Sequence, residues 1–111
     1  MAGIASMTPG EFRDRWPDFC SASDVMLLDV REPPELTMAS IDGAMHIPMA
    51  QIPGRLAELD RNGTIVVMCH SGVRSMQVAG YLHQRGFMNV FNLAGGIDAW
   101  SREVDPLIPR Y

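Results

Sequence analysis

Residues 64–75 have the sequence TIVVMCHSGVRS, and this stretch decides the fold of the chain. The β-branched run 64–68 predicts a strand, and a helical pattern begins at Ser75. Strands that alternate with helices indicate an α/β fold with a parallel sheet. Ligands of such sheets bind beyond the carboxyl ends of the strands. Cys69 lies at one of these ends, so the sequence predicts a site there.

Cys69 has the predicted surroundings of a reactive thiol. Loop amides before a helix N-terminus point inward around the turn, and the helix dipole adds partial positive charge. We therefore expect a depressed pKa for the Cys69 thiol and a reactive thiolate. Arg74 adds a fixed positive charge suited to an oxyanion. This setting favours catalysis over the alternative, a cysteine that packs as a small buried hydrophobe.

The other loop residues have expected roles of their own. His70 is expected at the rim of the loop or in contact with substrate. Ser71 and Ser75 are expected to donate hydrogen bonds to the sulfur, with helix N-cap as the alternative for Ser75. Gly72 provides the backbone geometry of a tight turn. The predicted substrate-binding loop comprises His70, Ser71, Gly72, Val73, Arg74 and Ser75.

Four residues outside the loop require a choice between structure and chemistry. Asp29 and Arg31 sit at the end of the predicted strand 25–30. We expect them to brace adjoining loops through hydrogen bonds rather than to contact substrate. His46 is expected to be a structural histidine. Cys20 is expected to be buried rather than to act as a second reactive thiol.

The composition is that of one globular domain of 111 residues. A net charge of −4 argues against a nucleic-acid or anionic membrane surface. No apolar run approaches the ~20 residues of a membrane span, and residues 1–7 lack the pattern of a signal peptide. Two separate cysteines and three scattered histidines have no metal-site spacing. We therefore expect a cytoplasmic protein with no metal site.

The periodicity predicts further elements on both sides of the 64–68 strand. A first helix begins with Thr8 as N-cap and Glu11 completing a capping box, and it ends near Pro17. The other predicted strands are 25–30, 45–47 and 89–93, and the other helical patterns are 52–59 and 75–85. Gly86 is expected to end the second of these helices.

Three more blocks of the sequence resemble those of rhodanese (sulfurtransferase) domains. The blocks are LDVREP (28–33) with Glu35, IDGAMHIP (41–48), and LAGGI (93–97) with Ala99 and Trp100. With the Cys69 loop they follow the family's order and cover about residues 5–105. The resemblance implies one rhodanese domain over residues 1–111. Its expected fold is a three-layer α/β/α sandwich around a mostly parallel five-stranded sheet, with a short first strand near residues 3–6.

The resemblance also implies an activity. Cys69 would take the sulfane sulfur of thiosulfate or of a persulfide donor and hold it as a persulfide. A thiophilic acceptor, such as cyanide or a cellular thiol, would then remove it. The acceptor thiol could belong to a protein. No cofactor or metal is implied, and no nucleic acid or membrane partner. We expect a monomer or weak homodimer.

Two other functions remain open at this point. The first is a cysteine-dependent phosphatase or arsenate reductase of related fold. Phosphatases that share this fold have five residues between the cysteine and the arginine, whereas this chain has the four residues 70–73. The shorter loop favours sulfur over phosphate. The second alternative is a non-catalytic rhodanese-like binding module, which the retained Cys69 argues against.

Overall fold

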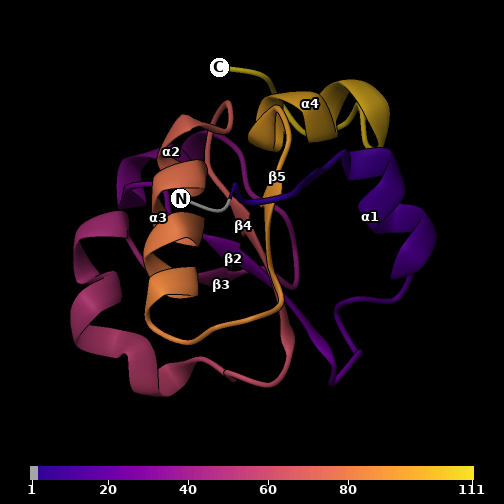
Figure 1. Cartoon of the computed structure of the whole chain (residues 1–111). Coiled ribbons are helices and arrows are strands. Elements are labelled where there is room, and N and C mark those ends of the chain that lie inside the picture. Colours follow the sequence, from indigo (N-terminus) through magenta and orange to yellow (C-terminus); the bar gives the residue numbers. More distant parts are fainter. Residues whose placement is uncertain (1–2) are drawn as a thin grey trace.

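The computed structural model describes residues 3–111 and shows a five-stranded sheet with helices on both faces (Figure 1). The sheet order is β1-β5-β4-β2-β3, and all the neighbouring strands pair in parallel. The strands are β1 (Ser6–Met7), β2 (Val25–Asp29), β3 (Met45–His46), β4 (Thr64–Met68) and β5 (Val90–Leu93). The predicted α/β fold with a five-stranded sheet is thereby confirmed.

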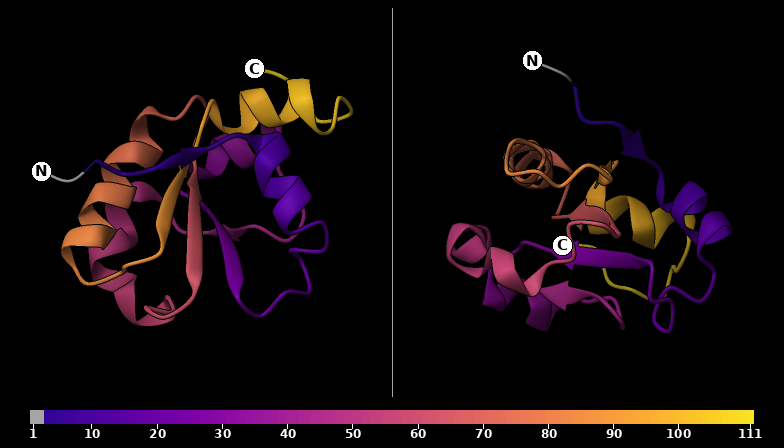
Figure 2. Two further views of the ribbon diagram at one scale, coloured as in Figure 1. Left: turned by 45° about the vertical axis from the view of Figure 1, so that its right-hand side comes forward. Right: turned by 60° about the horizontal axis from the view of Figure 1, so that its bottom comes forward.

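The helices form two layers, one on each face of the sheet (Figure 2). They are α1 (Pro9–Arg15), α2 (Pro33–Met38), the 3₁₀ helix η1 (Met49–Glu58), α3 (Val73–Gln84) and α4 (Gly96–Glu103). The α3 and η1 helices cover one face, where Ile52 and Leu82 are buried. The α1 and α4 helices cover the other face, where Phe12 and Trp100 are buried. The α/β/α sandwich therefore has a separate hydrophobic core on each side.

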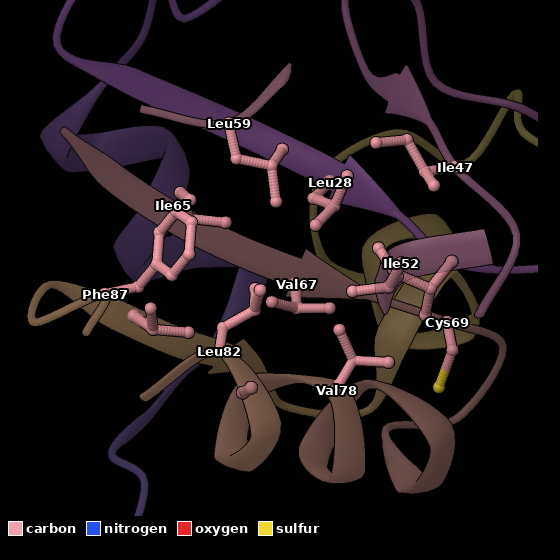
Figure 3. Close-up of a cluster of buried hydrophobic side chains, with 13 residues drawn as sticks. Leu28, Ile47, Ile52, Leu59, Ile65, Val67, Cys69, Val78, Leu82 and Phe87 are labelled. Atoms are coloured by element: carbon pink, nitrogen blue, oxygen red, sulfur yellow. The ribbon is translucent and has the colours of Figure 1, made fainter. Parts of the chain in front are cut away.

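The central strand β4 contributes to both cores because its side chains alternate between the two faces. Val66 and Met68 pack on the α1 and α4 side. Ile65, Val67 and Cys69 pack on the α3 side, where they follow one another along the strand (Figure 3). The two-residue period of the strand thus carries Cys69 to the face that α3 covers. The position of the thiol is a direct consequence of strand geometry.

The predicted element boundaries are close to those observed. Helix α1 begins at the predicted capping box, in which Thr8 accepts from the Glu11 amide and Glu11 accepts from the Thr8 amide. Strand β1 lies at Ser6–Met7, slightly later than residues 3–6, because its partners are Asn92 and Leu93. Within the described residues 3–111, no helix is long and apolar enough to span a membrane.

The helical pattern at 52–59 overlaps the helix η1, which is a 3₁₀ helix because Pro53 lacks an amide proton and Arg55 leaves the helical region at φ −127°. One prediction is wrong. Cys20 is exposed, and its sulfur lies 3.4 Å from the carbonyl oxygen of Asp42. The short helix α2 was also missed, since none of its residues is buried and it has no apolar period to detect.

Candidate active site

Cys69 follows the last residue of β4 and is buried, with 1% of its surface exposed. Its Sγ lies 3.1 Å from the amide nitrogen of Gly72 and 3.3 Å from Oγ of Ser75. Burial raises the pKa of the Cys69 thiol, but hydrogen bonds from Ser75, Gly72 and the Ser71 amide outweigh it, so the pKa is lowered. The donors therefore favour the thiolate that the sequence predicts.

Gly72 closes the loop and determines where α3 begins. Its φ of +106° lies in the left-handed region, which glycine adopts without steric penalty. Because Gly72 is the N-cap, α3 starts at Val73, earlier than the predicted start at Ser75. Ser75 is consequently inside the first turn of the helix and faces the sulfur. The alternative prediction, that Ser75 is the N-cap of this helix, is therefore wrong.

The first turn of α4 holds the backbone of the loop. The amide nitrogen of Ile97 donates to the Cys69 carbonyl at 2.9 Å, and that of Asp98 donates to the His70 carbonyl at 3.2 Å. A β-carbon on Gly96 would overlap both carbonyl groups. The turn can approach the loop this closely because Gly96 has no side chain and adopts a φ of +60°. The start of α4 thus fixes the backbone of the loop through two hydrogen bonds.

Ser75 connects the thiol to a buried amide. Its Oγ lies 2.5 Å from Oδ1 of Asn92, a residue of β5 that is itself buried. The side-chain nitrogen of Asn92, Nδ2, donates to Oγ of Ser6 in β1 at 3.4 Å. A hydroxyl carries one proton, so Ser75 donates either to Asn92 or to the Cys69 sulfur.

Arg74 is paired with Glu35 of α2 through both of its terminal nitrogens. Nη1 lies 2.7 Å from Oε2 and Nη2 lies 2.8 Å from Oε1. Glu35 also accepts from the Glu32 amide and from the Tyr111 hydroxyl. The hydrogen bonds from Arg74 are the main cause that lowers the pKa of Glu35 to about 2. Arg74 thus brings a positive charge to the loop, and the Glu35 carboxylate pairs with that charge.

The Glu35–Arg74 pair predicts an acid-sensitive contribution to stability. The pKa of Glu35 falls from 4.5 to about 2 in the folded chain. The contribution is therefore complete above about pH 4.5 and is lost as the pH falls toward about 2. We expect Glu35→Gln to lower the free energy of unfolding at pH 7, with the difference from wild type shrinking across that range. Urea unfolding at a series of pH values measures it.

Glu58→Gln is the matched control, because Glu58 forms a similar fork with Arg55 on the surface. Exposed ion pairs contribute little to stability. A Glu35→Gln difference that is no larger than that of Glu58→Gln, or that does not change with pH, would contradict the expected role of the pair.

Arg31 is fully buried and joins the ends of several segments. Its Nε donates to Oδ1 of Asp29 at 3.0 Å, its Nη2 donates to Oδ2 of Asp29 at 2.8 Å, and its Nη2 also donates to the Ala39 carbonyl at 2.9 Å. It also donates to the Tyr111 hydroxyl at 2.9 Å. Burial lowers the pKa of Arg31, but the hydrogen bonds with Asp29 outweigh it and raise the pKa. These contacts are those of a brace between β2 and the loops beyond it.

His46 and His70 have different surroundings. The Nε2 atom of His46 lies 2.6 Å from the Arg31 carbonyl oxygen, which agrees with a satisfied structural histidine. The His70 ring is partly buried and stacks on the ring of Tyr111, with centroids 4.1 Å apart and an angle of 10° between the planes. The His70 side chain therefore lies at the edge of the loop, against a residue from the far end of the sequence.

Of the predicted loop residues, Ser71, Gly72 and Ser75 form hydrogen bonds with the Cys69 sulfur. His70 and Arg74 have other partners, Tyr111 and Glu35, and Val73 is 67% exposed. Sequence reasoning gave no role to Glu35, Asn92 or Tyr111. Asn92 had a detectable signal, a polar residue within a short apolar strand. Tyr111 had none. Among residues 3–111, no cluster of histidine, cysteine and carboxylate side chains could hold a metal ion.

Comparisons with known proteins give the site a family. Residues 14–103 match the model of the "Rhodanese-like domain". A "Sulfurtransferase" of Allochromatium vinosum is 42% identical over 85 residues, which cover 77% of this chain and 79% of that protein. The "Probable adenylyltransferase/sulfurtransferase MoeZ" of Mycobacterium tuberculosis is 38% identical over 96% of this chain, which spans only 27% of that longer protein.

Solved structures agree with the sequence relatives. The crystal structure of SSP1007 from Staphylococcus saprophyticus has a TM-score of 0.78 and 36% identity, and the match covers 96% of this chain and 99% of that one. The chain therefore belongs to the rhodanese-like family of sulfurtransferases.

Proposed function

We propose that the chain transfers sulfane sulfur through a persulfide on Cys69, with thiosulfate or a persulfide as donor. The Cys69 thiolate attacks the outer sulfur of thiosulfate and forms an S–S bond. The original S–S bond breaks, and its electron pair leaves with sulfite. An acceptor such as cyanide then attacks the terminal sulfur. This step forms thiocyanate and returns the electron pair to Cys69 as thiolate.

One observation carries this proposal: a backbone amide and a hydroxyl both lie within hydrogen-bond distance of the Cys69 sulfur at the start of α3. The Gly72 amide lies 3.1 Å from the sulfur, and the Ser75 hydroxyl lies 3.3 Å from it. Donors held in place by the backbone stabilise negative charge without having to reorganise. The same amides would stabilise the terminal sulfur of a persulfide, in the way that an oxyanion hole stabilises oxygen. The sulfurtransferase names of the relatives support the same reaction type.

The chemistry of a thiolate nucleophile also leads to a proposed compartment and to proposed partners. A free thiolate nucleophile suits a reducing compartment, so we propose a cytoplasmic location. Donor and acceptor are small molecules, with a protein thiol as a further acceptor. The reaction needs no cofactor, metal, nucleic acid or membrane. We propose that the chain acts as a monomer or weak homodimer.

Intact-mass measurement after incubation with thiosulfate tests the proposal. The wild-type chain should gain the mass of one sulfur atom, and cyanide should remove that mass. Cys69→Ser should gain nothing, whereas Cys20→Ser should behave as the wild type does. Absence of the added sulfur with both thiosulfate and a small-molecule persulfide would reject sulfur transfer through Cys69.

Loop length gives a prediction against phosphatase activity. Four residues between Cys69 and Arg74 leave a cradle for one sulfur atom, and the amides cannot spread without straining the turn. We expect negligible hydrolysis of an aryl phosphate under conditions in which sulfur transfer is readily measured. Turnover of the phosphate at a comparable rate, and its loss in Cys69→Ser, would instead support the phosphatase function.

A further inference from the structure

Residues 105–111 form a segment that returns from α4 to the active-site end of the sheet (Figure 1). Three contacts hold this segment in place. The Ser101 hydroxyl donates to the Ile108 carbonyl. The Arg110 guanidinium pairs with Asp98 at 2.8 Å. Ile108 and Tyr111 also pack against the buried cluster on the α1 and α4 side. The end of the segment is therefore placed by several independent interactions.

Tyr111 contacts the loop that contains Cys69 and two charged residues beside it. Its ring stacks on His70, the residue next to Cys69. Its hydroxyl donates to Glu35 and accepts from Arg31, both at 2.9 Å. Glu35 is in turn the partner of Arg74. Tyr111 thus contacts His70 directly and is linked to Arg74 through Glu35. The two partners of its hydroxyl, Arg31 and Glu35, lie more than 70 positions from it in the sequence.

The sulfur transfer proposed above does not use these contacts. Tyr111 has more contacts than a tyrosine on an exposed surface usually has: a stack with His70 and two hydrogen bonds with charged groups. They fix a flat side chain at the rim of a loop whose cysteine is 1% exposed. Such a side chain restricts the width of any molecule that approaches the sulfur across the His70 side. Aromatic rings are well suited to this role because they are large and lose little conformational entropy when they are fixed.

We propose that Tyr111 is a specificity-determining residue that forms a wall of the Cys69 site. Resting on the proposed sulfur transfer, this inference names the class of acceptor. Small nucleophiles such as cyanide or sulfite reach the terminal sulfur with the wall closed. Bulky thiols need the Tyr111 ring to leave its stack on His70. The stack on His70 and the packing of Tyr111 on the α1 and α4 side hold the ring, and the ring itself excludes the larger molecule.

Thiol alkylation tests the wall without using sulfur transfer. All the variants carry Cys20→Ser, because Cys20 is exposed and would also react. Two reagents share one chemistry, in which the Cys69 thiolate displaces iodide: iodoacetamide and an iodoacetamide that carries a fluorescein group. The measured quantity is the ratio of their rate constants, bulky to small. A change in the pKa of Cys69 affects both rates equally and cancels in this ratio.

Tyr111→Ala should raise the ratio about tenfold, the effect expected when a closed state loses an aromatic stack. Tyr111→Phe keeps the ring and should leave the ratio within about twofold of that of the parent. His70→Ala removes the stack from the other side, so it should raise the ratio also. An equal acceleration of both reagents in Tyr111→Ala, or no change, would overturn the proposal.

A second measurement separates this inference from the proposed function. If thiosulfate adds no sulfur to Cys69 but the alkylation ratio rises in Tyr111→Ala, the wall is real and the proposed reaction is wrong. If sulfur is added normally and the ratio stays at the parent value, the reaction stands and the wall does not. Thermal unfolding of each variant shows that the compared chains are folded.

Discussion

Cys69→Ser is expected to abolish transfer of sulfur from thiosulfate to cyanide. A serine hydroxyl is a weaker nucleophile than a thiolate, and it cannot hold sulfur as a persulfide. The side chains have the same shape, so the hydrogen bonds around position 69 should keep the loop closed. We expect the thiocyanate produced by the variant to match the background without protein. Colorimetric detection of thiocyanate measures the rate, and the melting temperature shows that the variant is folded.

Cys20→Ser is the matched control for this experiment. Cys20 is exposed and its thiol donates a hydrogen bond to the Asp42 carbonyl, whereas Cys69 is buried. Its replacement should leave the rate of thiocyanate formation unchanged. If Cys69→Ser retained the wild-type rate, or if Cys20→Ser lost it, the assignment of the nucleophile would be wrong.

Gly96→Ala is expected to have the second large effect, on stability and on the site together. The added β-carbon would overlap the carbonyl groups of Cys69 and His70, which are backbone atoms that cannot turn aside. The φ of +60° at this position adds further strain for alanine. We expect a loss of more than about 2 kcal/mol in the free energy of unfolding. The loop must also shift, so sulfur transfer should fall more than the folded fraction alone explains.

The same substitution at Gly80 is the control, because Gly80 lies inside α3. A β-carbon there meets no atom of the described residues within 4 Å. Gly80→Ala should stabilise the chain by about 0.5–1 kcal/mol, since alanine favours the helix and restricts the unfolded chain. Urea unfolding compares the two variants. If Gly96→Ala were as stable as Gly80→Ala, the close packing of the α4 turn on the loop would not constrain the site.

The sequence predicts the features of the site that depend on local order. The β-branched run 64–68 identifies the strand β4 and places Cys69 at its carboxyl end. Gly72 is predicted at the turn because only a residue without a side chain adopts its conformation freely. These inferences succeed because each one needs only neighbouring residues.

Features that depend on distant segments were beyond the sequence. The partner of Arg74 is Glu35, which lies 39 positions away and reaches the loop only through the placement of α2. The contact between Tyr111 and His70 needs the path of residues 105–111 across the molecule. Neither pair leaves a periodic or compositional trace. The exposed position of Cys20 has the same origin, since it depends on how the loop after α1 meets the Asp42 carbonyl.

The short outer strands have a consequence for how copies of the chain meet. The sheet ends in β1 on one edge and β3 on the other, and each strand is only two residues long. The longer strands β2 and β4 are internal, so their backbone groups already have partners on both sides. Unpaired edge strands are templates for intermolecular β-pairing and aggregation. The two edge strands of this sheet are too short to pair extensively with another chain. We therefore expect that copies of the chain do not associate by joining their sheets edge to edge.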